Sequence, residues 1–254
     1  MAGNEVIIRT ENLQKDYSVG GKKHNIINNM ELSIYRGDFT VIMGSSGAGK
    51  STLLYMLSGM DKPSTGRITY AGKDITKMND DKLAVFRRSH CGFVFQQIHL
   101  IDNMSIMDNV ISTGMLTGQK QKTLKVKAEK LFSRIGISED LTEKFSSQLS
   151  GGEAQRCAMV RALINEPDVV FADEPTGALN SSGVKAVLDV LTDVNEEGQS
   201  VVMVTHDIKS ARRGNRIIYL KDGRVMGECN LGKYVSGDKE RHTKLRIFLE
   251  EMGW

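Results

Sequence analysis

Short apolar runs alternate along this chain with longer segments whose apolar residues recur every three or four positions. The runs at 39–43, 91–95, 169–174 and 200–206 predict strands that are buried on both faces. The segments between them predict helices at 51–59, 80–88, 105–116, 123–135 and 184–195, and a further helix that follows the two glycines within 149–163. Continuous apolar strands that alternate with helices are typical of a mainly parallel sheet covered by helices on both faces. The pattern therefore predicts an α/β fold.

The first part of the chain follows a different pattern. Residues 6–13 predict an opening strand, and residues 20–25 predict a turn. Residues 30–35 alternate apolar and polar side chains, as a strand with one exposed face does. The segments 67–70 and 72–75 then predict a hairpin.

The last part of the chain predicts a second hairpin and a tail. Residues 216–229 form two short apolar segments that turn at Asp222–Gly223, a favoured hairpin dipeptide. From about 238 to 252, apolar residues recur at helical spacing, which predicts an amphipathic helical tail. These apolar residues are Leu245, Phe248, Leu249 and Met252.

Length and composition narrow the class of protein. The 254 residues, of which 40% are apolar, fit a single domain over 1–254, with a helical insertion at about 97–165. The formal net charge is only +3, which argues against a dedicated nucleic-acid binder. Three widely spaced cysteines form no disulfide framework or zinc motif, so we expect a reducing, cytoplasmic compartment. We see no signal peptide and no run of about 18 apolar residues, so another chain would have to anchor the protein at a membrane.

The segment GSSGAGKST matches the P-loop pattern and lies between a predicted strand and a predicted helix. Its residues are Gly44, Ser45, Ser46, Gly47, Ala48, Gly49, Lys50, Ser51 and Thr52. Glycines allow backbone N–H groups to converge on one anion, and the helix N-terminus adds positive potential. We expect Lys50 to reach the β- and γ-phosphates of a nucleotide and Ser51 to ligate Mg²⁺. The alternative is a glycine-rich turn that caps a helix.

Two later strand ends carry side chains suited to phosphate hydrolysis. The apolar strand VVFADE ends in Asp173, which can hold Mg²⁺ through water, and Glu174 follows as a candidate general base. His206 ends another strand and is expected to hydrogen-bond the γ-phosphate and hold the attacking water. The alternative for His206 is a histidine that is satisfied by local backbone groups.

Two further residues are candidates at the same site. Gln96 follows the strand 91–95, where its amide oxygen would ligate Mg²⁺ or orient water. Tyr17 follows the first predicted strand and would stack on adenine. Taken alone, each has an ordinary alternative: Gln96 as a loop residue and Tyr17 as a surface tyrosine.

A second phosphate-binding pattern lies a hundred residues later, in the signature segment LSGGE (residues 149–153). Ser150, Gly151 and Gly152 precede a predicted helix, as in an anion site. Ser150 and Glu153 also fit a capping box, in which each side chain bonds the other residue's backbone. The capping box explains the serine and the glutamate but not the adjacent glycines, which weaken a first helical turn.

Tyr17, GSSGAGKST, Gln96, LSGGE, VVFADE, GALN and VTHD occur in this order, and together they resemble the nucleotide-binding subunit of an ATP-binding cassette (ABC) transporter. The resemblance implies the P-loop NTPase fold, with an antiparallel β portion near the N-terminus and a helical insertion. It also implies ATP and Mg²⁺ as cofactors and a head-to-tail dimer. Each ATP would lie between the P-loop of one copy and the Ser150–Gly152 segment of the second copy, which explains why one chain has two phosphate-binding patterns.

Two positions depart from the family pattern. The family usually has Gln where Glu153 stands, and a carboxylate near a triphosphate is repelled, so we expect Glu153 to face the ribose or the cap. The family usually has Asp where Asn180 stands, so we expect weaker coupling across the interface there. Neither change removes a catalytic group, and we expect an active ATPase.

The resemblance also implies a transmembrane permease as partner, so that the chain would lie peripherally on the inner face of the membrane. The loop after Gln96, with Ile98, Leu100, Ile101 and Met104, is the candidate contact, unless these residues pack the insertion's own core. The sequence is most similar to the subfamily that serves macrolide export, lipoprotein release and cell division. Its tail is similar to that of bacitracin-type peptide-resistance ATPases, which implies a permease with a large extracellular domain.

The resemblance raises three possible functions. The first is an ATPase that drives export of, or resistance to, peptide antibiotics or related amphiphiles. The second is a cell-division or lipoprotein-release type of mechanotransmission ATPase that moves no solute across the membrane. The third is a soluble ABC-type ATPase that acts on DNA or ribosomes. The third would require a long coiled-coil insertion or two cassettes in one chain, and neither is present in this sequence.

Overall fold

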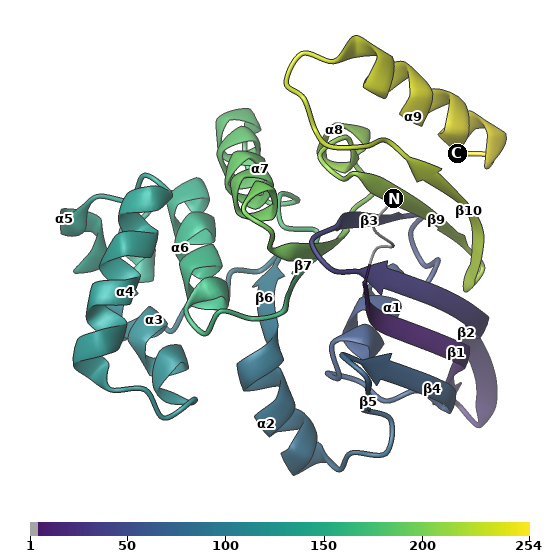
Figure 1. The fold of residues 1–254 in the computed structure, drawn as a ribbon, viewed down its shortest axis with the longest axis horizontal. Helices are drawn as coiled ribbons and strands as arrows, with labels where there is room; N and C mark the ends of the chain where they lie inside the picture. Colours follow the sequence, from purple (N-terminus) through teal and green to yellow (C-terminus); the bar gives the residue numbers. More distant parts are fainter. Residues whose placement is uncertain (1–4) are drawn as a thin grey trace.

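The computed structural model describes residues 5–254, which form two β-sheets and the helices that pack on them (Figure 1). The strands are β1 (Val6–Val19), β2 (Lys22–Tyr35), β3 (Phe39–Met43), β4 (Thr65–Tyr70), β5 (Lys73–Asp74), β6 (Cys91–Phe95), β7 (Val169–Asp173), β8 (Ser200–Val204), β9 (Arg216–Lys221) and β10 (Arg224–Asn230). The helices are α1 (Lys50–Leu57), α2 (Asp80–His90), α3 (Ile106–Met115), α4 (Gln121–Arg134), α5 (Glu139–Thr142), the 3₁₀ turn η1 (Ser146–Gln148), α6 (Gly151–Leu163), α7 (Ser181–Glu196), α8 (Ile208–Ala211) and α9 (Lys239–Glu251).

The larger sheet is mainly parallel, as the apolar runs predict. Its described strands lie in the order β10-β9-β3-β8-β7-β6. β3 pairs in parallel with β8 and β9, and β7 pairs in parallel with β6 and β8, whereas β10 pairs antiparallel with β9. The predicted α/β class and mainly parallel sheet are therefore confirmed.

Side chains along the buried strands alternate between two apolar clusters, one on each face of this sheet. On β8, Val201 and Met203 contact the cluster that includes α3, α4, α6, α7 and α9. Val202 and Val204 contact the other cluster, which includes α1, α2 and the smaller sheet. Because both faces are covered, the strands have no polar side, which is why they read as continuous apolar runs.

The smaller sheet is antiparallel, with the described strands in the order β2-β1-β4-β5. β1 and β2 are much longer than predicted, and the turn expected at 20–25 is confined to Gly20–Gly21, because residues from Lys22 onward already pair with β1. The start of β2 could not be predicted from an apolar pattern, because its first four residues are polar and exposed. α1 packs between the two sheets (Figure 1).

The predicted tail helix is confirmed as α9, which lies over β10 at the upper right of Figure 1. Leu245, Phe248 and Leu249 are buried against the main core. Arg241 is only 3% exposed, and its guanidinium donates to backbone carbonyls of two segments, 212–214 and 231–233. The tail is therefore an integral part of the packed structure.

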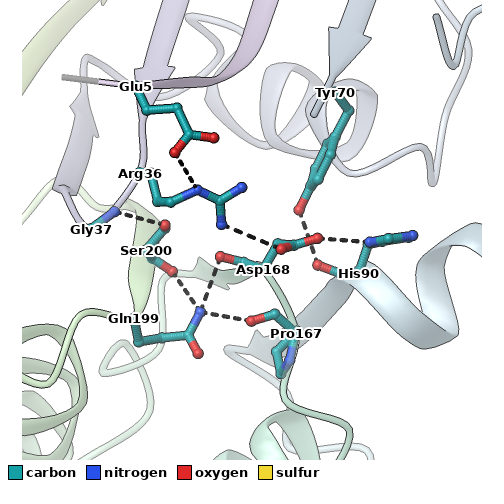
Figure 2. A network of polar contacts seen from close by, with 9 residues as sticks. All are labelled: Glu5, Arg36, Gly37, Tyr70, His90, Pro167, Asp168, Gln199 and Ser200. Atoms are coloured by element: carbon teal, nitrogen blue, oxygen red, sulfur yellow. Dashed lines mark hydrogen bonds and ion pairs between the residues drawn. The ribbon is translucent and has the colours of Figure 1, made fainter. Parts of the chain in front are cut away.

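A polar network joins the two sheets at the amino end of β7 (Figure 2). Asp168 accepts from His90 Nδ1 at 2.7 Å and pairs with Arg36 at 3.4 Å, and Arg36 also pairs with Glu5 at 3.0 Å. The hydroxyl of Tyr70 donates to the carbonyl of His90 at 2.9 Å. The site described next lies at the opposite, carboxyl end of β7. The network is therefore separate from that site, and we assign it a structural role.

Candidate functional site

The candidate residues meet at the carboxyl edge of the parallel sheet. The register places Ile42 beside Val204, Val204 beside Asp173, and Asp173 beside Phe95. The carboxyl ends of β3, β6, β7 and β8 are therefore aligned along one edge of the sheet. The residues that follow these strand ends are the P-loop, Gln96, Glu174 and His206. This edge is where ligands bind in open α/β sheets.

The P-loop runs from the end of β3 to α1, which begins at Lys50 directly after Gly49. Gly44 lies so close to β9 that a Cβ atom there would sit 2.2 Å from the carbonyl oxygen of Leu220. Such a distance is far inside van der Waals contact, so only glycine fits at this position. A Cβ atom at Gly47, by contrast, would meet nothing within 4 Å, which leaves the outer side of the loop open to a ligand.

Lys50 is buried, and the hydrogen-bond partners of its ammonium group are backbone carbonyls. Its Nζ donates to the carbonyl oxygens of Gly44 and Ser45, each at 2.9 Å. In the part of the chain that the structure describes, no carboxylate lies within ion-pair distance of Nζ, and burial lowers the pKa of Lys50 against the opposing effect of Glu174 and Asp173. A buried cation that has only carbonyl partners fits a phosphate as its counter-ion.

Asp173 is 8% exposed, and donors from α1 hold both of its carboxylate oxygens. Ser51 Oγ donates to Oδ1 at 2.9 Å, and Tyr55 Oη donates to Oδ2 at 2.8 Å. Burial and the hydrogen bond with Asp173 raise the pKa of Tyr55 to about 12, so Tyr55 is a protonated donor at neutral pH. The sequence analysis missed Tyr55, although its spacing of four residues from Ser51 places both on one helix face.

Glu174 and His206 form a pair at the ends of β7 and β8. His206 Nδ1 lies 2.8 Å from Glu174 Oε1, and since a carboxylate only accepts, Nδ1–H is the donor. Glu174 has φ of 46°, and its backbone N–H donates to the carbonyl of Val204 at 3.0 Å. The His206 side chain is 67% exposed and that of Glu174 only 16%, so the histidine covers the carboxylate from the solvent side.

Tyr17 lies on β1, where the residue is 41% exposed and its hydroxyl is anchored. The hydroxyl donates to Asp61 Oδ2 at 2.8 Å, and Lys15 Nζ lies 4.9 Å from the ring centroid and 2.6 Å from Asp61 Oδ1. Although burial alone would raise it, these bonds hold the pKa of Asp61 below its usual range. The sequence analysis missed Asp61, which lies 44 positions from Tyr17, and also Lys15, although Lys15 is only two residues from Tyr17 on β1.

The signature segment begins α6 and forms the capping box. Ser150 Oγ accepts from the backbone N–H of Glu153 at 3.4 Å, and Glu153 Oε2 accepts from the backbone N–H of Ser150 at 2.8 Å. The Ser150 hydroxyl also donates to Glu153 Oε2 at 2.6 Å, and these bonds lower the pKa of Glu153. The expectation that Glu153 faces the cap is therefore confirmed for a single chain.

The two glycines of the signature segment pack against the segment that begins α7. A Cβ atom at Gly152 would lie 3.2 Å from the Cα of Gly183, and one at Gly151 would lie 3.3 Å from Leu179. Asn180 caps α7 by accepting from the backbone N–H of Gly183 at 2.9 Å. Within residues 5–254, no hydrogen bond or ion pair joins the signature segment to the P-loop, so one chain does not bring its two phosphate-binding patterns together.

Gln96 is exposed directly after β6, and its side-chain amide packs against Gly177, where a Cβ atom would meet Nε2 at 2.8 Å. The described residues contain no cluster of three or more His, Cys, Asp or Glu side chains that would hold a metal ion. One serine hydroxyl and one carboxylate fit Mg²⁺ instead, because that ion takes few protein ligands and completes its shell with water and phosphate. The roles of the candidate residues at a nucleotide, including those of Gln96, Thr52 and Ser46, stay predictions.

The loop after Gln96 is divided between core and surface. Leu100 is partly buried and packs on the main apolar cluster, whereas Ile101 is 52% exposed. Ile98 and Met104 are partly buried. Arg161 of α6 fixes the loop by donating to the carbonyl of Ile98 at 3.0 Å and to that of His99.

The sequence profile of the ABC transporter family matches residues 27–177, more than half of the chain. The chain belongs to the ABC transporter family. It is an ATPase cassette of this family, with ATP and Mg²⁺ as its cofactors.

Several ABC relatives match most of this cassette. The lipoprotein-releasing system ATP-binding protein LolD of Aquifex aeolicus is 41% identical over 87% of this chain and 97% of its own length. The bacitracin export ATP-binding protein BceA of Halalkalibacterium halodurans is 35% identical over 97% and 96%. The macrolide export ATP-binding/permease protein MacB 2 of Yersinia pestis is 40% identical over 88% of this chain, which spans only 33% of that longer protein.

A solved ABC cassette has the same fold. A dimeric post-hydrolysis state of the cassette MJ0796, bound to ADP and Pi, superimposes with a TM-score of 0.79 and 37% identity over 89% of this chain and 100% of that chain. In this ABC subunit, no helix among the described residues is long and apolar enough to cross a bilayer.

Proposed function

We propose that two copies of this chain close head to tail on two Mg-ATP and drive a membrane permease. The observation that carries the proposal is the separation of the two phosphate-binding patterns within one chain. The P-loop, Asp173 and Glu174 share one edge of the sheet, whereas Ser150 is bonded to its own helix cap. Only a second copy supplies Ser150–Gly152 to the nucleotide. The dimer reported for the cassette MJ0796 supports this arrangement.

The residues of the catalytic edge have distinct proposed roles. Backbone N–H groups of the P-loop, from Ser45 to Thr52, and the Lys50 ammonium bind the phosphates. Ser51, Asp173 through water, and Gln96 would hold Mg²⁺, which would neutralise phosphate charge. Tyr17 stacks on adenine.

Glu174 is the proposed general base for the attacking water. The bond from His206 Nδ1 to Glu174 Oε1 leaves the second carboxylate oxygen for the water and His206 Nε2 for the γ-phosphate. His206 therefore positions the base and the water together. Hydrolysis removes the phosphate that joins the two copies, and the dimer loosens.

The proposed partner is a transmembrane permease of the type with a large extracellular domain, and the cassette lies peripherally on the inner face of the membrane. A groove of about 810 Å³ between α2, β6 and α6 is the proposed contact, and Phe95 and His99 from either side of Gln96 line it. We propose that α3–α6 form a subdomain that moves on ATP binding and carries the motion to this groove. No nucleic acid is part of the proposal, since the net charge is +3.

The relatives support two alternative functions for the complex. BceA matches across nearly the whole chain, including the tail, and supports export of, or resistance to, peptide antibiotics or related amphiphiles. LolD is more identical but over fewer residues, and supports the alternative of a mechanotransmission ATPase that moves no solute across the membrane. Packing of α9 into the core favours the first, because it makes the tail shared with BceA part of the domain.

Replacing Glu174 by Gln tests the catalytic part of the proposal. We expect E174Q to bind ATP and to lose turnover by at least a hundredfold, because its amide cannot take the proton from water. We expect the variant to accumulate as an ATP-bound dimer by analytical ultracentrifugation. E166Q, an exposed substitution away from the site, is the matched control. Retained turnover in E174Q would remove Glu174 as the base.

Affinity purification of the tagged chain from its own cells tests the partner. A permease with a large extracellular domain that co-purifies with the ATPase supports the transport proposal. A lipoprotein-release or division-type permease in its place supports the alternative.

A further inference from the structure

Tyr55 is the one residue of α1 whose side chain reaches both the catalytic edge and the proposed permease groove, among the described residues. Its hydroxyl donates to Asp173 Oδ2 at 2.8 Å. The same side chain lines the groove of about 810 Å³ together with Phe95 and Ala84. A single aromatic ring therefore separates a surface open to a partner from the carboxylate assigned to Mg²⁺.

The groove is built to receive a partner of opposite charge. Its basic lining side chains are Arg87, Arg88, His99 and Arg161, and no Asp or Glu lines it among the described residues. Apolar surface comes from Met60 and Leu116, which are 46% and 57% exposed. A permease segment with apolar and acidic side chains would fit this lining.

The backbone of Tyr55 also connects the groove to the adenine side of the site. Its carbonyl oxygen accepts from the N–H groups of Met60 at 2.8 Å and Asp61 at 3.1 Å. Asp61 in turn accepts from the Tyr17 hydroxyl at 2.8 Å. A displacement of the Tyr55 ring acts first on Asp173, because the contact there is a direct hydrogen bond.

We propose that Tyr55 is a positioning residue that holds Asp173 ready for Mg²⁺ and transmits occupancy of the groove to that carboxylate. Ser51 and Tyr55 fix one carboxylate oxygen each, so loss of either bond frees Asp173 to rotate. A partner side chain that presses on the Tyr55 ring would move its hydroxyl relative to Oδ2. The second half of this inference rests on the proposed permease function, whereas the first half does not.

A Mg²⁺ titration of Y55F tests the positioning role. We would use the full-length E174Q protein, so that nothing is hydrolysed, and measure binding of a fluorescent ATP analogue as MgCl₂ is added. Y55F keeps the ring and loses the hydroxyl. We expect its half-saturating Mg²⁺ concentration to rise about tenfold, as for other lost hydrogen bonds to metal ligands. Binding of the analogue without Mg²⁺ should stay the same.

Y70F is the matched control, because it removes a buried tyrosine hydroxyl that bonds the His90 carbonyl at the far end of the sheet. We expect its Mg²⁺ dependence to equal that of the parent protein. An unchanged or lower half-saturating Mg²⁺ concentration in Y55F would overturn the positioning role. Circular dichroism and thermal unfolding verify that each variant is folded.

A double-mutant cycle tests transmission from the groove. A84W fills the groove from α2, where Ala84 is exposed. We expect A84W to shift the Mg²⁺ half-saturation at least threefold in the parent protein and to have no effect in Y55F. An equal shift in both backgrounds, or none in either, would reject Tyr55 as the link. Neither result bears on whether a permease co-purifies, so the proposed function is tested separately.

Discussion

Ser150 has two proposed tasks that one substitution separates. In the single chain, its hydroxyl accepts from the Glu153 N–H and donates to the Glu153 carboxylate, which completes the cap of α6. In the dimer, it would donate to the γ-phosphate bound by the second copy. S150A removes both contacts and leaves the backbone of the signature segment unchanged.

The two losses differ in size. Replacing an N-cap serine by alanine costs about 1 kcal/mol, which lowers the unfolding midpoint by roughly 2–4 °C in a domain of this size. A hydrogen bond to a charged group contributes about 1.5–3 kcal/mol. A symmetric dimer contains that bond twice, which sets an upper limit of about 3–6 kcal/mol on the fall in its dissociation free energy, because closure also breaks the bond from the Ser150 hydroxyl to Glu153 in each copy. Since 1.4 kcal/mol is a factor of ten, the dimer dissociation constant rises by at most roughly a hundredfold to ten-thousandfold.

The assay compares unfolding and dimerisation in one set of samples. Sedimentation of S150A in the E174Q background with Mg-ATP measures the dimer, and differential scanning calorimetry measures the folded chain. N79A is the matched control, because Asn79 caps α2 by accepting from the Lys82 N–H at 3.0 Å, away from the signature segment. We expect N79A to lose stability but to dimerise normally. Normal dimerisation of S150A would refute the shared-site reasoning. An equal loss of dimerisation in N79A would refute it as well.

Two further predictions concern the P-loop and Asp61, which accepts a hydrogen bond from the Tyr17 hydroxyl. G44A should be destabilised by more than about 3 kcal/mol or fail to fold, because its Cβ would sit 2.2 Å from the carbonyl oxygen of Leu220. Urea unfolding or the yield of soluble protein measures this loss. A stable G44A would contradict the packing argument. The lowered pKa of Asp61 means that its ion pair stabilises the fold above the ordinary carboxyl pKa of about 3.9 and is lost as pH falls through the lower folded value. The unfolding midpoints of wild type and D61N should therefore differ at neutral pH and converge below about pH 4, whereas a constant difference would contradict this linkage.

The fold could be predicted to the extent that burial leaves a periodic trace in the sequence. β3, β6, β7 and β8 are apolar throughout because helices cover both faces of their sheet, and each was found within two residues. The part of β2 before Met30 was missed because most of its side chains are polar and its first four residues are exposed, and its pairing with β1 is made by the backbone. Strand pairing through the main chain leaves no trace in side-chain pattern.

The candidate site could be predicted where a motif is continuous in sequence. The P-loop and the Asp173–Glu174 pair combine several residue types at fixed spacing, whereas Asp61 reaches Tyr17 from 44 positions away. Tyr55 did leave a signal, at four residues from Ser51 on the same helix. Its use became apparent only when β7 was placed against that helix face, because a helical tyrosine alone is an ordinary core residue.

The residues at the two positions that depart from the family pattern have the same structural role. Glu153 and Asn180 both act as capping residues, one at the start of α6 and one at the start of α7, and those helix starts pack against each other through Gly152 and Gly183. A carboxylate at Glu153 binds the Ser150 N–H more strongly than a neutral amide would, because the bond is charge-assisted. The same charge repels a triphosphate.

To bind the second copy's nucleotide, Ser150 must therefore turn its hydroxyl from Glu153 to phosphate, so the cap competes with dimer closure. E153Q weakens the cap but should strengthen the ATP-held dimer. A weaker E153Q dimer in the sedimentation assay would mean that the carboxylate assists closure.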